Sequence, residues 1–219
     1  MFKFDKLVFG DLGWGDELLF ATLMTITVSI LSMGLGLCLA IITVWAKLIT
    51  NRITRLIANF YTTVVRGVPE LLVIYLIFFG GNSVVMGVAK LFGYNGYIEL
   101  NALTIGTIAI AFISATYSSE VIRAAYLAVN KGQVEAAKAL GLNKIQIFLR
   151  VMGPQIIRYA LPGIGNVWQI TLKDTSLISV TGLVEIMRQT RIASNVEHSP
   201  LTFLITAAFL YLFLTTFSG

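Results

Sequence analysis

Long uncharged apolar runs constrain this chain more than any other feature of its sequence. Crossing the hydrocarbon core of a bilayer takes about 20 mostly apolar residues, and five stretches approach or exceed that length. Only 12% of the 219 residues are charged and 57% are hydrophobic, whereas a soluble domain carries about 25% charged residues. Lipid must therefore cover part of this chain. The runs are 18–46, 71–89, 100–119, 159–172 joined to 175–184 across a charged pair, and 199–219.

These runs predict helices rather than strands. No segment alternates apolar and polar residues over the length of a barrel strand, and a bilayer admits only helices or closed barrels. The sequence therefore predicts an all-α fold, a polytopic membrane helical bundle of about five transmembrane helices, as a single domain over residues 1–219. The one cysteine, Cys38, excludes an internal disulfide and any multi-cysteine metal site.

The basic residues predict the orientation of the bundle. Cytoplasmic loops carry an excess of Lys and Arg, and eight of these residues fall on one side against five on the other. We expect the N-terminus outside and the C-terminus inside, and we expect the native chain to continue past Gly219, because the last run lacks a basic cap. The inner set is Lys47, Arg52, Arg55, Lys131, Lys138, Lys144, Arg150 and Arg158, and the outer set is Lys3, Lys6, Lys90, Arg188 and Arg191.

The inner segment 130–154 differs from a simple connecting loop. Strong helix formers precede Gly141, which suits the left-handed residue that closes a helix. Asn143 can cap a second helix, which Gly153-Pro154 should end. Two short helices meeting at a glycine are suited to docking against a partner, and small residues such as Ala136, Ala137 and Ala139 would let that partner approach closely. An interfacial amphipathic pair lying on lipid is the alternative, and the physical pattern alone leaves both open.

The same segment resembles the EAA loop of bacterial ABC importer permeases. That loop reads E-A-A, three residues, G, nine residues, I-x-L-P. This chain has Glu135-Ala136-Ala137, then Gly141, then Val151-Met152-Gly153-Pro154 at the same spacing. Two positions depart from the pattern: valine replaces isoleucine at Val151, and glycine stands at Gly153 where leucine is usual.

Other segments resemble the polar amino-acid branch of that family over nearly the whole chain. They are Arg66-Gly67-Val68-Pro69, Glu120 with Arg123 followed by Gly132-Gln133, and Leu172-Lys173-Asp174-Thr175-Ser176-Leu177. Within the branch, Val73-Ile74-Tyr75-Leu76 is most similar to permeases for histidine, basic amino acids and opines.

The resemblance implies a function, partners and a fold. A type I ABC importer permease has no catalytic site of its own. ATP and magnesium are expected on a partner ATPase dimer, beside a second permease subunit and an extracytoplasmic substrate-binding protein. The location implied is the bacterial inner membrane, and the cargo is a polar, basic amino acid or an opine. The residues implied in ATPase coupling are Gly132, Glu135, Ala136, Ala137, Gly141 and Pro154.

Charges inside or beside the apolar runs are the candidates for a substrate pathway, because charge within a membrane is costly and is usually functional. Glu120 and Asp174 could accept a cationic side chain, and Arg66 could receive a carboxylate. Pairing within the bundle is the alternative: Glu120 and Arg123 are three residues apart, and Arg66 and Glu70 are four apart.

Two rival functions remain from the residues alone. A secondary transporter or channel would need no docking segment, and such carriers usually show two related halves, which are not visible here. A membrane enzyme should present a catalytic or metal-binding cluster, but the chain has one histidine, one cysteine and no carboxylates at metal-ligand spacing. The sequence does not decide which amino acid or opine is carried, or whether the permease pairs with itself or with a relative.

Overall fold

The computed structural model describes residues 4–10, 13–94, 96 and 101–218. Within those residues the chain is helical and has no strand. The helices are η1 (Phe4–Leu7), α1 (Gly15–Leu48), α2 (Arg52–Gly67), α3 (Glu70–Leu91), α4 (Ala102–Ala128), α5 (Lys131–Ala139), α6 (Lys144–Ile147), the π-helical η2 (Phe148–Met152), α7 (Gly153–Asp174), the 3-10 helix η3 (Thr175–Thr181), α8 (Ile186–Glu197) and α9 (Pro200–Ser218).

Four of these helices are long and apolar enough to cross a membrane: α1, α3, α4 and α9. The predicted membrane bundle is thus confirmed, but its count of five is not. The fourth expected span is α7, whose 22 residues would extend about 33 Å, but it carries Arg158, Lys173 and Asp174. Leu100 and Gly219, the outer limits of two expected spans, and Lys3 of the outer basic set lie outside the described residues.

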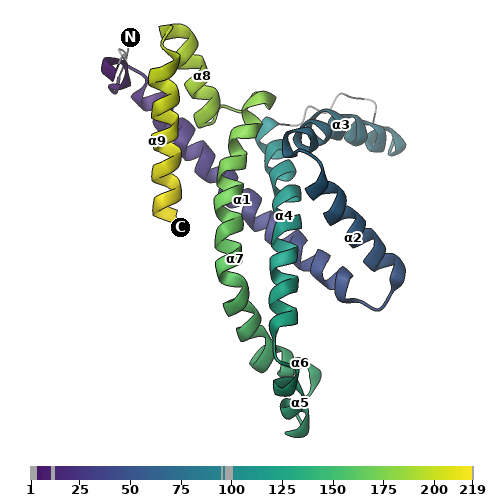
Figure 1. The fold of residues 1–219 in the computed structure, drawn as a ribbon. Helices are drawn as coiled ribbons and strands as arrows, with labels where there is room; N and C mark the ends of the chain where they lie inside the picture. Colours follow the sequence, from purple (N-terminus) through teal and green to yellow (C-terminus); the bar gives the residue numbers. More distant parts are fainter. Residues whose placement is uncertain (1–3, 11–12, 95, 97–100, 219) are drawn as a thin grey trace.

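Helix α2 was not predicted from the apolar runs, because it is amphipathic and carries Arg52, Arg55 and Arg66. It returns from the α1–α2 turn and ends where the chain changes direction (Figure 1). The change occurs at Val68, which is extended (φ −108°, ψ 143°) because the following Pro69 disfavours helical backbone. The chain therefore bends just before Pro69, whereas Pro162 lies inside α7 without ending it.

Helix α4 forms the centre of the bundle. Of its apolar window 67% is buried, against 11% for α3, and α1 and α7 pack along it (Figure 1). At Gly36 of α1 an added Cβ would lie 2.1 Å from the Ser114 Oγ and 3.1 Å from the Ala111 carbonyl oxygen of α4. Gly34 has no such neighbour within 4 Å. α1 and α4 therefore pack closely at Gly36, whereas Gly34 lies on an exposed face of α1.

A buried carboxylate joins α8 to α9. Glu185 has no exposed surface; it accepts hydrogen bonds from the backbone N–H groups of Met187 and Arg188 (2.8 Å each) and from the Tyr211 hydroxyl of α9 (2.9 Å). Burial raises the pKa of the Glu185 carboxyl, while the hydrogen bonds and the nearby Arg191 act in the opposite direction.

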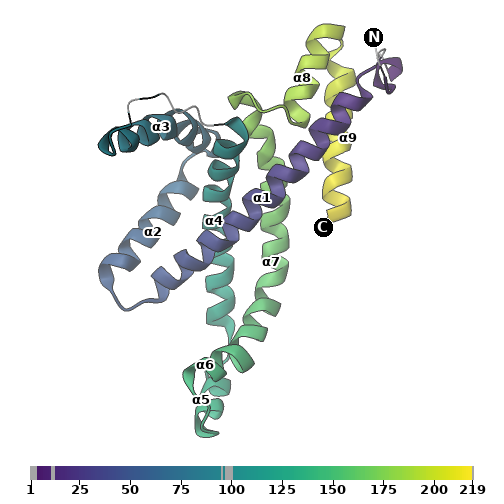
Figure 2. The same ribbon diagram turned by 180° about the vertical axis from the view of Figure 1, so that it is seen from behind.

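The two ends of the molecule are made by different segments. In both views α5 and α6 form the tip of one end, and α8 lies toward the other (Figures 1 and 2). The turn between α1 and α2 also lies toward the α5–α6 end. The two basic segments of the predicted inner side therefore lie toward the same end of the molecule.

Candidate functional site

Helices α5 and α6 form a bent unit at one end of the molecule, which we call the elbow (residues 130–147). The Asn130 side chain accepts a hydrogen bond from the Gly132 N–H at 2.8 Å and so caps α5. Gly141 closes α5 in the left-handed conformation (φ +75°), with its N–H on the Lys138 carbonyl (2.9 Å). The predicted pair of helices meeting at Gly141 is therefore confirmed.

The second half of the elbow starts as predicted and continues further than predicted. Asn143 caps α6 in a reciprocal capping box with Gln146 (2.9 and 3.0 Å). Gly153-Pro154 does not end this helix, so that expectation is wrong. The chain passes into the π-helical segment η2, in which the Gly153 N–H donates to the Phe148 carbonyl, and it continues as α7. Pro154 falls in the first turn of α7, where its missing N–H is tolerated.

The elbow presents a mixed apolar and charged surface. Leu140, at its tip, is 81% exposed, and Glu135, Ala136 and Ala139 are exposed on α5. Ala137 is only 4% exposed, so it packs within the chain and does not form part of the outer surface of α5. A hollow of about 300 Å³ lies beside α5, lined by Tyr126, Leu127, Val129, Lys131, Val134, Glu135, Lys138 and Met152.

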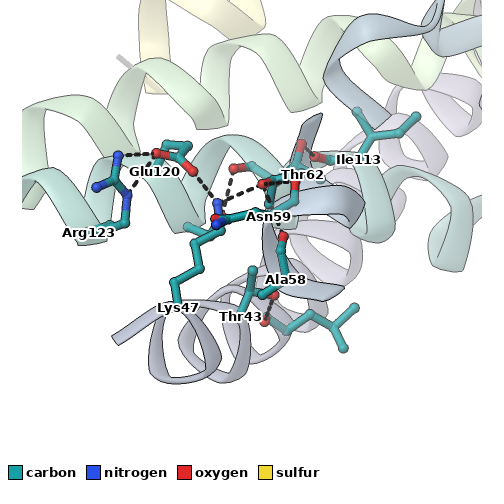
Figure 3. A network of polar contacts seen from close by, with 11 residues as sticks. Thr43, Lys47, Ala58, Asn59, Thr62, Ile113, Glu120 and Arg123 are labelled. Carbon is teal, nitrogen blue, oxygen red and sulfur yellow. Dashed lines mark hydrogen bonds and ion pairs between the residues drawn. The ribbon is translucent and has the colours of Figure 1, made fainter. Parts of the chain in front are cut away.

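A charge cluster built around the buried Lys47 joins α1, α2 and α4 (Figure 3). The Lys47 ammonium donates to the Glu120 carboxylate and, at 2.6 Å, to the Thr62 hydroxyl. The other oxygen of Glu120 accepts from Arg123 at 2.8 and 3.0 Å, so the predicted Glu120–Arg123 pair is confirmed. Lys47 was missed as a partner, because a lysine at the end of an apolar run also fits the inner basic excess. Its side chain is only 5% exposed.

A second cluster lies one turn along α4. The Tyr117 hydroxyl donates to Glu70 at 2.9 Å, and the Arg66 guanidinium carbon lies 5.5 Å from the centroid of the Tyr117 ring. The Asp174 carboxyl group faces that of Glu70. Arg66 and Glu70 form no ion pair, because the break at Val68 puts them on different helices and a spacing of four no longer aligns them.

A polar hollow of about 630 Å³ adjoins both clusters. Lys47 and Glu120 line it near the first, and Arg66 and Tyr117 line it near the second. It is large enough for an amino-acid-sized polar molecule, and its remaining lining is supplied by α2 through Asn59, Thr62, Thr63 and Gly67. The structure thus brings Arg66 and Glu120 to one hollow. Asp174 does not line this hollow; it lies beside Glu70, which is hydrogen-bonded to the lining residue Tyr117.

The comparisons with known sequences agree with one another. The model of the family described as binding-protein-dependent transport system inner membrane component matches residues 32–219. The chain is 50% identical over 214 residues to the nopaline transport system permease protein NocQ of Agrobacterium fabrum, covering 97% of this chain and 91% of that one. It is 46% identical to the octopine transport system permease protein OccQ of Agrobacterium tumefaciens (96% and 89% covered). The histidine/lysine/arginine/ornithine transport system permease protein HisQ of Escherichia coli is 39% identical (94% and 90% covered).

Solved structures give the same fold. An amino acid ABC transporter crystallised with histidines matches with a TM-score of 0.80 at 29% identity, over 94% of this chain and 90% of that one. The MetNI methionine ABC transporter matches with a TM-score of 0.64 at 16% identity, over 92% and 90%, which supports the fold alone.

Proposed function

This chain belongs to the family of binding-protein-dependent transport system inner membrane components, and from that premise we propose that it carries a basic amino acid or an opine, driven by ATP hydrolysis on separate subunits. It is a permease subunit of an ABC importer of the amino-acid and opine type. The observation that carries this function is the likeness along nearly the whole chain to permeases of nopaline, octopine and basic amino-acid systems.

The elbow is the contact through which the ATPase would act. Its tip residue Leu140 is exposed, and the carboxylate of Glu135 is free to meet a partner's donors. The elbow continues through η2 into α7 without a loop, so a displacement at the tip would be transmitted along a helix. ATP binding would close the ATPase pair and tilt the spans between inward-open and outward-facing states by rigid-body movement. The assigned coupling residues are Gly132, Glu135, Ala136, Ala137, Gly141 and Pro154; of these, Ala137 is buried within the elbow and Pro154 lies beyond it, at the start of α7.

The substrate pathway would run past Arg66, Tyr117, Glu70 and Asp174. Asp174 faces a second carboxyl group, that of Glu70, and two carboxyl groups together suit a guanidinium or ammonium group. Glu120 has both oxygens bonded to cations of its own chain, so of the two candidate acceptors Asp174 is better suited to the substrate. Arg66 would receive a carboxylate.

The orientation and partners follow from the family and from the distribution of charge. The elbow and the α1–α2 turn would face the cytoplasm, which gives an outer N-terminus and an inner C-terminus across the bacterial inner membrane. A second permease subunit, two ATPase subunits holding ATP and magnesium, and an extracytoplasmic binding protein would complete the importer. Residues 1–219 would act in it as one transmembrane domain.

Uptake by the reconstituted importer tests this function, with Asp174→Asn as the decisive variant. The wild-type complex should accumulate arginine in proteoliposomes only when ATP and the binding protein are both present. Asp174→Asn should raise the KM for arginine about tenfold, because a charged contact worth on the order of 1.4 kcal/mol is lost, and Asp174→Glu should stay near the wild type. ATP-independent uptake would instead support a secondary transporter or channel, and an unchanged KM in Asp174→Asn would remove Asp174 from the pathway.

A further inference from the structure

The joint between the elbow and α7 is the π-helical turn η2. Turns of this kind are rare, usually occur singly within α-helices, and are frequent at functional sites. In η2 the Gly153 N–H donates to the carbonyl of Phe148, five residues earlier. One extra residue in a helical turn rotates the preceding segment by about 100° relative to a continuous α-helix. The direction in which the elbow projects from α7 therefore depends on this turn.

Gly153 is the residue that admits the π-helical turn. A Cβ added at this position would lie 2.9 Å from the Phe148 carbonyl oxygen, which is a backbone atom and cannot rotate aside. Position 153 is also where this sequence has glycine and the EAA pattern has leucine. A side chain at this position is incompatible with the turn as it stands, so the departure from the pattern has a structural consequence.

The Gln155 side chain ties the turn to α5. Its amide group donates to the Val151 carbonyl of η2 at 2.7 Å and to the side-chain oxygen of Gln133 on α5 at 2.6 Å. Pro154, the residue before it, has no N–H with which to bond the preceding turn, and the Gln155 amide supplies a donor to that turn. We call the contact between Gln133 and Gln155 the glutamine bridge.

Packing brings the same segments together. Helix α5 lies against η2, and Val134 of α5 and Met152 of η2 line one hollow. Ala137 and Ile147 are buried within the elbow, at 4% and 5% exposure. The elbow therefore has an interior of its own, and the glutamine bridge links it to α7 beyond the turn.

From this geometry we propose that Gly153, Gln155 and Gln133 are positioning residues for coupling, which fix the elbow to α7 so that the two move as one rigid body. The proposal rests on the proposed function and deepens it by identifying the joint through which the ATPase would act on the permease. Gly153 sets the direction of the elbow, and the glutamine bridge keeps it. An elbow that pivots on η2 during each cycle is the opposite arrangement, because the bridge would then have to open.

A cross-link in place of the glutamine bridge tests the rigid joint. In a Cys38→Ser background, Gln133→Cys and Gln155→Cys are combined and joined by a short thiol-specific cross-linker in the complete importer, reconstituted in proteoliposomes. The measured quantity is the amount of arginine transported per ATP hydrolysed. Before cross-linking it should fall about fivefold, the factor expected for one ordinary hydrogen bond, and after cross-linking it should recover. Each single-cysteine variant, treated with the same reagent, controls for modification alone.

Two further variants test the bridge and the turn separately. Gln155→Leu keeps the approximate size of the side chain and removes its donors, so it should show the same loss of transport per ATP if the double-cysteine variant does not assemble. Gly153→Leu should turn the elbow away from α7, so most of the cross-link between positions 133 and 155 should be lost. Gly165 of α7 has no described atom within 4 Å of an added Cβ, and Gly165→Leu should leave the yield unchanged. Mass spectrometry of the cross-linked peptides measures this yield independently of transport.

The outcomes separate this inference from the function beneath it. Wild-type transport per ATP in both the uncross-linked double-cysteine variant and Gln155→Leu would overturn the rigid joint. Transport that is lost or not recovered on cross-linking would also overturn it, as would equal cross-link yields in Gly153→Leu and Gly165→Leu. In all of these cases ATP-driven uptake by the wild-type importer stands. Loss of ATP-driven uptake in the wild-type complex would instead refute the proposed function.

Discussion

Replacing Gly141 by aspartate should reduce substrate uptake at least about tenfold while the permease still inserts and assembles. Gly141 closes α5 with φ +75° and has no atom of the chain within 4 Å of where a Cβ would stand. An aspartate there strains the turn, because L side chains rarely adopt this left-handed backbone. It also adds a charge at the tip that would meet the ATPase, and an unpaired charge buried in an interface is costly. Glu135→Lys, on the same elbow, should uncouple transport because it reverses the charge of a residue on the surface that would meet the ATPase. Uptake and ATP hydrolysis measured on one preparation separate uncoupling from loss of the complex.

The chain offers a matched control for Gly141→Asp. Gly93 also has a positive φ (+82°) and open space around it, but it follows α3 and is not part of the elbow. Gly93→Asp introduces the same strain and the same charge away from the elbow and should leave uptake near the wild-type value. Equal losses in the two variants, or normal uptake by Gly141→Asp, would count against a coupling role for the elbow.

Replacing Gly36 by leucine should destabilise the permease by about 2 kcal/mol or more, because α1 and α4 pack too closely there to admit a side chain. A Cβ at this position would stand 3.1 Å from the Ala111 carbonyl oxygen, which belongs to the backbone of α4 and cannot rotate away. The measurement is the amount of permease recovered from the membrane and the thermal unfolding of the purified complex.

Gly34 supplies the comparison on the same helix. It lies two residues away and has no atom within 4 Å of an added Cβ. Gly34→Leu changes the helix propensity and hydrophobicity of α1 as Gly36→Leu does, but without the clash. If both leucine variants unfold at the wild-type temperature, the close packing of α1 on α4 is not what stabilises the bundle.

Features determined by local chemistry could be predicted from the sequence. The elbow followed from helix formers, a glycine and an asparagine in the right order, and the structure has the Gly141 turn and the Asn143 cap that this order implies. The pairing of Glu120 with Arg123 followed from their spacing on one helix. The apolar runs located four spans, because their length and composition depend on no partner.

Features determined by packing between distant segments could not be predicted. Lys47 and Glu120 are 73 residues apart, and only the packing of α1 on α4 brings them together. The failed Arg66–Glu70 pair has the same origin: the helix spacing argument assumed one helix, but Pro69 separates two. Pro154 suggested a helix end, whereas the π-helical turn before it lets the helix continue.

Helix α2 shows a further limit of the hydropathy argument. Because α2 contains arginines, it does not form an apolar run and was not identified from hydropathy. It nevertheless lines the polar hollow with Asn59, Thr62, Thr63 and Arg66. Its amphipathic pattern was available in the sequence and would have located it. The side of the hollow that carries most of its polar groups was therefore the part that hydropathy alone left out.

A photoreactive benzophenone side chain in place of Leu140 tests most directly whether the elbow is the site of ATPase contact. Leu140 is 81% exposed at the tip of the elbow, and Phe92, at 87%, is a comparable exposed position after α3. Illumination of membranes that contain the whole importer should join the permease to the ATPase subunit from position 140 and not from position 92. The same adduct from position 92, with none from position 140, would contradict the account.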